Sequence, residues 1–174
     1  MEITFELTEE DYINYNISHA GRSPSMKKSI FIQRIMGPAI FVFMPFIVMR
    51  FTDIPLWYWL LVFGGASIIW FAYYPKYASW EITRRVKKML EEGDNENLFN
   101  QRTLVLTDEG ITETSSIGES HIRWDKINHL EETEDYLYIY VSSVSAHIVP
   151  KRVFENLSEQ EKFISKITGY ISDK

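Results

Sequence analysis

The stretch that decides the class of fold is GPAIFVFMPFIVMRFTDIPLWYWLLVFGGASIIWFAYYPKY, residues Gly37–Tyr77. Before its last two positions the only charged residues are Arg50 and Asp53, which lie close together near the middle. They separate two apolar blocks, 35–49 and 54–74. A helix rises about 1.5 Å per residue, so roughly 20 apolar residues cross the hydrocarbon core of a bilayer.

The two blocks predict transmembrane helices at about 30–49 and 54–74. The second block has spanning length by itself, and the first reaches it when it begins at Ile30 and Arg34 extends its guanidinium towards the headgroups. A two-helix core hairpin of a soluble protein is the alternative. Such a helix carries charged residues on its outer face, and 54–74 has none. We therefore expect a transmembrane hairpin over 29–76.

Basic residues flank the hairpin on both sides, whereas the turn contains Arg50 alone. They are Arg22, Lys27, Lys28 and Arg34 before and within the first span, and Lys76, Arg84, Arg85, Lys87 and Lys88 after the second. The positive-inside rule then predicts that both termini are cytoplasmic. Of these residues, Arg84, Arg85, Lys87 and Lys88 are candidate contacts for anionic lipid headgroups. A role in topology alone is the favoured alternative.

Residues 1–28 and 77–100 connect the hairpin to the rest of the chain. In the N-terminal segment Ile3, Phe5 and Leu7 alternate with polar residues, which predicts a half-buried strand. Thr8-Glu9-Glu10-Asp11 then resembles a capping box at the start of a helix. Because a lone strand is unstable in water, we expect it to complete the sheet of the C-terminal domain. Residues 77–100 are expected to form a juxtamembrane helix, from Ser79 to Glu92, and a linker.

Residues 101–174 have the pattern of a small β domain. Period-two stretches separated by turn residues predict six strands, at 102–107, 111–115, 121–124, 127–133, 136–141 and 146–149. A helix follows, for which Ser158 to Glu161 reads as a capping box. Antiparallel strands closed by one helix are typical of a pleckstrin-homology-like (PH-like) barrel. The predicted fold is therefore an α+β membrane protein, with a transmembrane hairpin and a cytoplasmic PH-like antiparallel β-barrel capped by a C-terminal helix.

A surface on this domain is the candidate site for partner binding. Tyr136, Tyr138 and Tyr140 share one face of a predicted strand, opposite Leu137, Ile139 and Val141. If the tyrosine face is exposed, it joins Lys151 and Arg152 as a surface of the residue types that anchor protein interfaces. A solvated strand end is the plainer interpretation of the two basic residues.

Motifs for catalysis, metal binding and cofactor binding are missing from the sequence. There is no cysteine, the histidines show no metal-ligand spacing, and GxSxG, GxxxxGK[ST] and GxGxxG are absent. His147 lies beside the tyrosine strand, where a polar site is one interpretation and a surface or hydrogen-bonded strand histidine is the favoured one. From residue 77 onward the sequence contains 12 Lys plus Arg and 18 Asp plus Glu. This net negative charge disfavours binding to nucleic acid. We expect no enzyme activity, no metal and no cofactor.

The segment IRWDKINHLEETEDYLYIYVSSVSAHIVPKRVF, residues Ile122–Phe154, carries a resemblance. Its Ile-x-Trp-x-x-Ile pattern, its Tyr-Leu-Tyr-Ile-Tyr strand and its closing Ile-Val-Pro-Lys-Arg-Val-Phe are similar to the YcxB-like family of bacterial membrane proteins. The resemblance implies a PH-like C-terminal domain and a location in the bacterial plasma membrane. It implies no catalytic residues.

These features together predict a membrane-anchored interaction or scaffold protein. Its cytoplasmic domain is expected to bind a protein partner or a second copy of the chain. The alternative is an immunity or stress-tolerance protein that acts through the transmembrane hairpin. Gene neighbourhood discriminates between them, because a toxin operon favours immunity and a division or sensor operon favours a scaffold.

Overall fold

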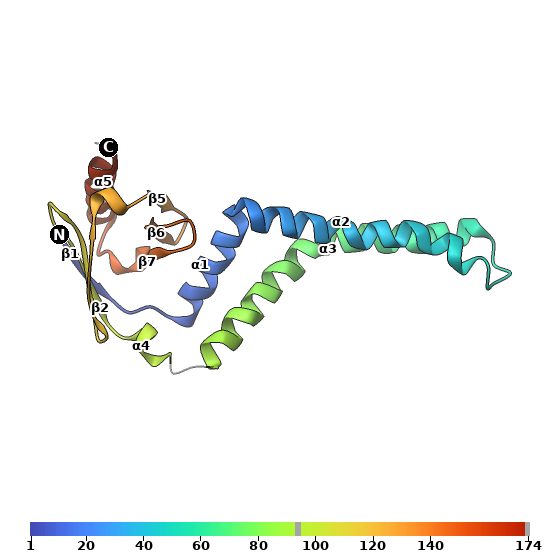
Figure 1. Ribbon diagram of the computed structural model, residues 1–174, viewed down its shortest axis with the longest axis horizontal. Coiled ribbons are helices and arrows are strands. Elements are labelled where there is room, and N and C mark those ends of the chain that lie inside the picture. Colours follow the sequence, from blue (N-terminus) through green and yellow to red (C-terminus); the bar gives the residue numbers. More distant parts are fainter. Residues whose placement is uncertain (93–94, 173–174) are drawn as a thin grey trace. The chain divides into compact units, whose positions relative to one another are not determined.

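The computed structural model describes residues 1–92 and 95–172, apart from the side chain of Glu96. The chain divides into two compact units, a helical unit over residues 16–85 and a β-rich unit made of residues 1–15 and 86–174. The chain forms the following elements, most of which Figure 1 labels. They are β1 (Glu2–Phe5), α1 (Glu9–Arg22), α2 (Pro24–Val48), α3 (Leu56–Glu91), α4 (Glu96–Phe99), β2 (Arg102–Leu106), β3 (Gly110–Ser115), β4 (Gly118–Arg123), β5 (His129–Glu132), β6 (Tyr136–Tyr140), β7 (Ala146–Pro150) and α5 (Leu157–Ser172), with short 3-10 turns η1 (Trp124–Lys126) and η2 (Lys151–Val153).

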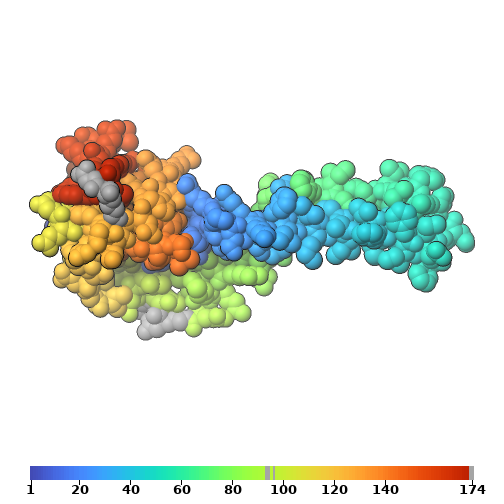
Figure 2. All heavy atoms as spheres, turned by 45° about the horizontal axis from the view of Figure 1, so that its top comes forward, coloured from blue at the N-terminus to red at the C-terminus, as the bar shows by residue number. Residues whose placement is uncertain are grey.

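The helical unit is a hairpin of α2 and α3, which lie side by side in Figures 1 and 2. Side-chain contacts fix their antiparallel register. The Tyr74 hydroxyl donates to Gln33 Oε1 at 2.6 Å, and the Phe41 and Phe63 rings are 6.2 Å apart. Gly37 allows the closest approach, because a Cβ at this position would lie 2.6 Å from the Trp70 ring.

Both helices of the hairpin are long and apolar enough to cross a membrane. Their apolar side chains are not buried in a protein core, since Phe43, Leu61 and Ile68 are each more than 65% exposed. A soluble core hairpin would bury these side chains, so the exposure favours lipid as their surroundings.

Two details of the hairpin differ from the sequence-based expectation. The second span and the juxtamembrane helix are one continuous helix, α3, which passes through Pro75 without a break. The Arg34 side chain contacts α3 rather than extending away from it. Its Nε donates to the Phe71 carbonyl at 3.0 Å, and its guanidinium lies 3.8 Å from the centre of the Phe71 ring. The partner helix therefore supplies its polar and cation–π contacts.

The β-rich unit contains two antiparallel sheets rather than one closed barrel. The first has the strand order β1-β2-β3-β4, and the second has the order β5-β6-β7. All six strands predicted in the C-terminal domain are present, with bounds that differ by one to three residues. The predicted barrel closure is not seen within residues 1–92 and 95–172, where no ladder joins the two sheets.

The N-terminal strand pairs with the first strand that follows the hairpin. β1 runs antiparallel to β2, with Glu2 opposite Val105 and Phe5 opposite Arg102. Residues 6–101 thus lie between two strands that are hydrogen-bonded neighbours. Ile3, Phe5 and Leu7 are each at most 6% exposed and belong to the core of the unit.

Helix α5 covers this core with one face. Phe163 and Ile167 are wholly buried. The helix begins at Leu157, so the predicted capping box at Ser158 is wrong by two residues. Asn156 Oδ1 instead accepts the Glu159 N–H at 3.0 Å, and Glu159 Oε2 accepts the Glu155 N–H at 2.9 Å. Asn is as favourable as Ser at the N-cap position, so Asn156 sets the start of α5.

Trp124 is a central part of the packing in this unit. It lies in η1, just after β4, rather than at the end of a strand as predicted, and it is 7% exposed. Its indole N–H donates to the Thr107 carbonyl at 3.2 Å, and its ring stacks on Tyr170 of α5 at 4.5 Å between centroids. One side chain therefore connects the first sheet to the closing helix.

Replacing Trp124 with Ala is expected to lower the free energy of unfolding of the β-rich unit by about 3 kcal/mol, because it opens a cavity and removes the contact with α5. Hydrogen–deuterium exchange of the β-strand amides in the full chain, held in detergent, measures the change. His121→Ala is the control, since His121 is exposed and bonds only to Thr112. Equal protection in the two variants would contradict the packing role of Trp124.

Candidate functional site

The tyrosine stripe predicted to be exposed is buried. Tyr136, Tyr138 and Tyr140 are 8%, 1% and 4% exposed. β6 is the central strand of its sheet, and the Tyr15 ring of α1 lies 5.5 Å from the Tyr138 ring. The partner-binding role proposed for this stripe therefore loses its premise, which was exposure.

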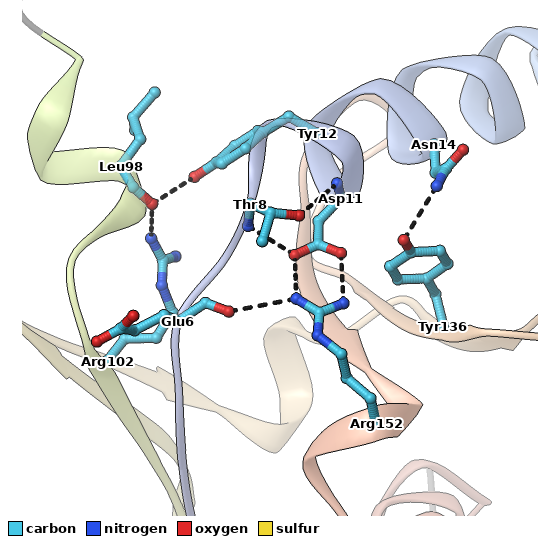
Figure 3. Close-up of polar contacts among 9 residues, drawn as sticks. All are labelled: Glu6, Thr8, Asp11, Tyr12, Asn14, Leu98, Arg102, Tyr136 and Arg152. Atoms are coloured by element: carbon cyan, nitrogen blue, oxygen red, sulfur yellow. Dashed lines mark hydrogen bonds and ion pairs between the residues drawn. The ribbon is translucent and has the colours of Figure 1, made fainter.

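The two basic residues predicted to accompany the stripe are bound to carboxylates of the same chain. Lys151 Nζ lies 2.7 Å from Glu132 Oε1. Arg152 makes a bidentate pair with Asp11, with N–O distances of 2.7 and 2.6 Å, and a longer bond of 3.4 Å to the Glu6 carbonyl (Figure 3). These contacts occupy the groups that a ligand would need.

Asp11 is the centre of this group of polar contacts, and its side chain is fully buried. The Thr8 N–H donates to Asp11 Oδ2 at 2.7 Å, and the Asp11 N–H donates to Thr8 Oγ1 at 3.3 Å, so the predicted capping box is present. Burial alone would raise the pKa of Asp11. The hydrogen bonds and charge of Arg152 and the Thr8 N–H outweigh burial and hold this pKa below its ordinary value.

Two further contacts join α1 to the β-rich unit. The Asn14 amide donates to the Tyr136 hydroxyl at 3.0 Å. The Tyr12 hydroxyl donates to the Leu98 carbonyl at 3.3 Å, and the same carbonyl accepts from Arg102 Nη2 at 2.6 Å (Figure 3). The first turns of α1 are therefore fixed to β6, to η2 and to the segment before β2.

A second polar cluster lies where the two sheets meet. Glu113 of β3 accepts from Arg102 Nη1 at 3.0 Å and is hydrogen-bonded to His147 Nδ1 of β7. All three side chains are at most 16% exposed. The hydrogen bond from His147 outweighs burial and, with Arg102, holds the pKa of Glu113 below its ordinary value. His147 is thus a hydrogen-bonded strand histidine, as the sequence suggested.

The chemistry available to these two clusters is limited by their pairing. Asp11 and Glu113 are each held as carboxylates by an arginine, and such groups accept hydrogen bonds but do not readily take up protons. Glu113 also lines a shallow hollow of about 280 Å³ beside the β3–β4 turn. Within residues 1–92 and 95–172, no three His, Asp or Glu side chains are grouped as metal ligands. The absence of a catalytic or metal site stays a prediction.

The predicted lipid-contacting residues differ in their partners. Arg85 pairs with Glu81 at 2.8 Å, Lys87 with Glu9 at 3.0 Å and Lys88 with Glu92 at 3.4 Å. Arg84 instead lies over the Trp80 ring, at 5.6 Å from its centre. The four basic residues are therefore not equivalent.

Comparison with known families adds an assignment for the C-terminal part. Residues 106–167 match the family model described as YcxB-like protein. In this segment the chain is similar to the YcxB-like family, in agreement with the resemblance seen in the sequence. The matching segment covers β3 to β7 and most of α5, and it leaves out β1 and the hairpin. The matched segment therefore lacks β1, which completes the first sheet, and α1, which packs on the second sheet. No curated protein and no solved structure matched the chain.

Asp11→Asn is expected to destabilise the β-rich unit by about 3 kcal/mol, the lower end of the range for breaking a buried pair, because Arg152 is itself half exposed. Urea unfolding of the full chain in detergent, followed by hydrogen exchange of α1 and β6, measures it. Asp125→Asn is the matched control, since the Asp125–Arg123 pair is exposed on both sides. A loss of equal size in both variants would contradict the role of burial.

Acid should weaken the same unit. A folded-state pKa below the unfolded value means that Asp11 and Glu113 contribute stability above about pH 4, which is lost as the pH falls through their folded-state values. The urea midpoint is therefore expected to fall as the pH is lowered below about 4.5. Asp11→Asn should make this fall shallower, whereas an unchanged slope would show that Asp11 does not contribute to it.

Proposed function

We propose that the protein is a non-catalytic, membrane-anchored interaction protein of the bacterial plasma membrane. In this proposal the hairpin spans the bilayer twice and the β-rich unit is a cytoplasmic PH-like domain that binds a protein partner. The two apolar helices support the membrane anchor, and the similarity of residues 106–167 to the YcxB-like family agrees with it. A four-stranded sheet, a three-stranded sheet and a C-terminal helix, in that order, support the PH-like description.

The observation that carries the proposal is the pairing of β1 with β2. The chain leaves the sheet after β1, passes through the hairpin and returns to the same sheet at β2. Both ends of the hairpin are therefore connected to one folded domain, which requires an even number of membrane crossings. Two connections restrict the domain to the membrane surface more strongly than one would, which suits a protein that presents a binding surface there.

The orientation follows from the charges of the helical unit. Arg50 is the only basic residue of the turn, and the other basic residues lie towards the ends that connect to the domain. By the positive-inside rule, these ends and both termini are cytoplasmic.

Single cysteines test this topology, because the chain has none of its own. Phe51→Cys in the turn replaces a side chain that is 83% exposed, and Ser143→Cys lies in the exposed β6–β7 turn. An impermeant thiol reagent applied to intact cells is expected to label position 51 and to leave position 143 unlabelled until the cells are lysed. Labelling of position 143 in intact cells would reverse the orientation.

A groove along α5 replaces the tyrosine stripe as the proposed partner surface. It has a volume of about 630 Å³ and lies between the end of β5 and the outer side of the helix. Leu157, which is 75% exposed, and Ile164 give it apolar contacts, and Glu161 gives it an acidic one, whereas the lining residue Glu132 is already paired with Lys151. Gly169 leaves part of the groove open. Apart from its own stretch of helix, no described atom lies within 4 Å of where a Cβ would stand.

The proposed occupant is a basic segment of another protein. Residues 1–15 and 86–174 together hold 10 Lys plus Arg against 22 Asp plus Glu, a net charge of −12. A second copy would bring the same charge and be repelled, whereas a basic partner would be attracted. This favours a basic partner over self-association.

A photo-crosslinking residue at Leu157 of the full chain, in intact cells, tests the groove. We expect an adduct with a basic protein that is reduced when Glu161→Lys is added. The same probe at Ile117, which is 71% exposed on the β3–β4 turn, is the matched control and should not give this adduct. Identical adducts from both positions would refute the groove, and an adduct with a second copy would refute the choice of partner.

A further inference from the structure

Positive charge in the helical unit is concentrated at one end. Residues 16–85 hold eight Lys plus Arg and two acidic residues. Arg50 and Asp53 share the turn between the helices, so seven basic residues and only Glu81 remain outside it. The β-rich unit has the opposite charge, so its acidic surface gives the anionic lipids of a membrane no attraction. Any attraction to such lipids must come from this end of the hairpin.

The register of the two helices brings these basic residues to the same end. Gln33 lies against Tyr74, and Phe41 against Phe63. Because the helices are antiparallel, residues before Gln33 in α2 are level with residues after Tyr74 in α3. Lys27 and Lys28 therefore lie at the same end of the pair as Lys76 to Arg84, and all four of the residues Lys27, Lys28, Lys76 and Arg84 are exposed.

Four side chains on this part of α3 form one stripe. Lys76, Tyr77, Trp80 and Arg84 follow one another at spacings of one, three and four residues, which is one side of a helix over about 12 Å. Tyr77 and Trp80 are 52% and 53% exposed, and their ring centres are 5.9 Å apart. The Arg84 guanidinium lies over the Trp80 ring. The stripe thus places two aromatic rings, of the kind that sit at the headgroup level of a bilayer, between two cations.

The neighbouring cations are less available for a ligand. Arg85, Lys87 and Lys88 each face a carboxylate of the same chain. Arg84 has an aromatic partner instead, and a guanidinium on a ring keeps its N–H edge open to bind a phosphate with two hydrogen bonds. An ammonium such as that of Lys76 adds a second positive charge two helical turns away.

We propose that this stripe is a binding site for the phosphodiester headgroup of anionic phospholipids, with Arg84 and Lys76 as the cationic contacts and Trp80 and Tyr77 as the interfacial anchors. The site replaces the broader patch of four basic residues considered from the sequence. It rests on the proposed membrane crossing, which the cysteine labelling tests independently.

The experiment uses the full chain reconstituted in phosphatidylcholine bilayers that contain spin-labelled phosphatidylglycerol or spin-labelled phosphatidylcholine. The fraction of motionally restricted label gives the preference of the protein for the anionic lipid. We expect a preference in the native chain that falls in Lys76→Gln and in Arg84→Gln, by up to about fivefold for each cation. Arg84→Lys should lose part of the preference, because an ammonium keeps the charge but cannot form the bidentate contact, and 1 M salt should weaken the preference in the native chain.

Arg50→Gln is the matched control, because it removes an exposed cation from the opposite end of the hairpin. Its preference for the anionic lipid is expected to equal that of the native chain. If both glutamine variants at Lys76 and Arg84 keep the native preference, or if Arg50→Gln loses as much, the site is refuted. Each variant is also given a cysteine at position 51, whose labelling in intact cells shows whether the topology has changed. A variant that inserts normally and loses the lipid preference supports the site.

Discussion

The structure depends on one ladder of backbone hydrogen bonds between strands that are far apart in the sequence. β1 and β2 pair across residues 6–101, and the ladder is extended by the Leu106 N–H, which donates to the Met1 carbonyl at 2.8 Å. Without this pairing β2 would be an edge strand, and Ile3, Phe5 and Leu7 would have no core to enter. The hairpin is therefore inserted within the β-rich fold rather than attached to one end of it.

The contacts of α1 make the same connection through side chains. Asp11 and Arg152 are 141 residues apart in the sequence, yet their charges are paired. Contacts of Tyr12, Asn14 and Tyr15 lie beside this pair. Together they hold the first turns of α1 against the second sheet and the segment before β2. The burial of the tyrosines of β6 is a consequence, because α1 covers the face of β6 that would otherwise meet water. Any partner must therefore bind elsewhere, and the acidic α5 groove and the basic stripe of α3 offer different chemistry for a protein and for a lipid.

The sequence predicted features that depend on local patterns and missed those that depend on distant contacts. The two long apolar helices, the strands and the cap at Thr8 follow from composition and periodicity, and the structure confirms that these elements are present. The Tyr-Leu-Tyr-Ile-Tyr segment alternates as a half-exposed strand would, but a central strand that is covered on both faces has the same pattern. The buried pairing of Asp11 and Glu113 was not predicted, since nothing near them in the sequence indicates Arg152, Arg102 or His147. Five large side chains in succession were the available signal of a fully buried strand.

The position of the hairpin also sets an order for events during synthesis. β1 leaves the ribosome before its partner, and β2 follows only after 96 more residues, or about 5 to 20 seconds of translation at usual rates. During this interval the apolar side chains of β1 have no sheet to join, while the two apolar helices are synthesised. The β-rich unit can therefore close only after the hairpin has been made, so that completion of its fold reports that both apolar helices have already emerged.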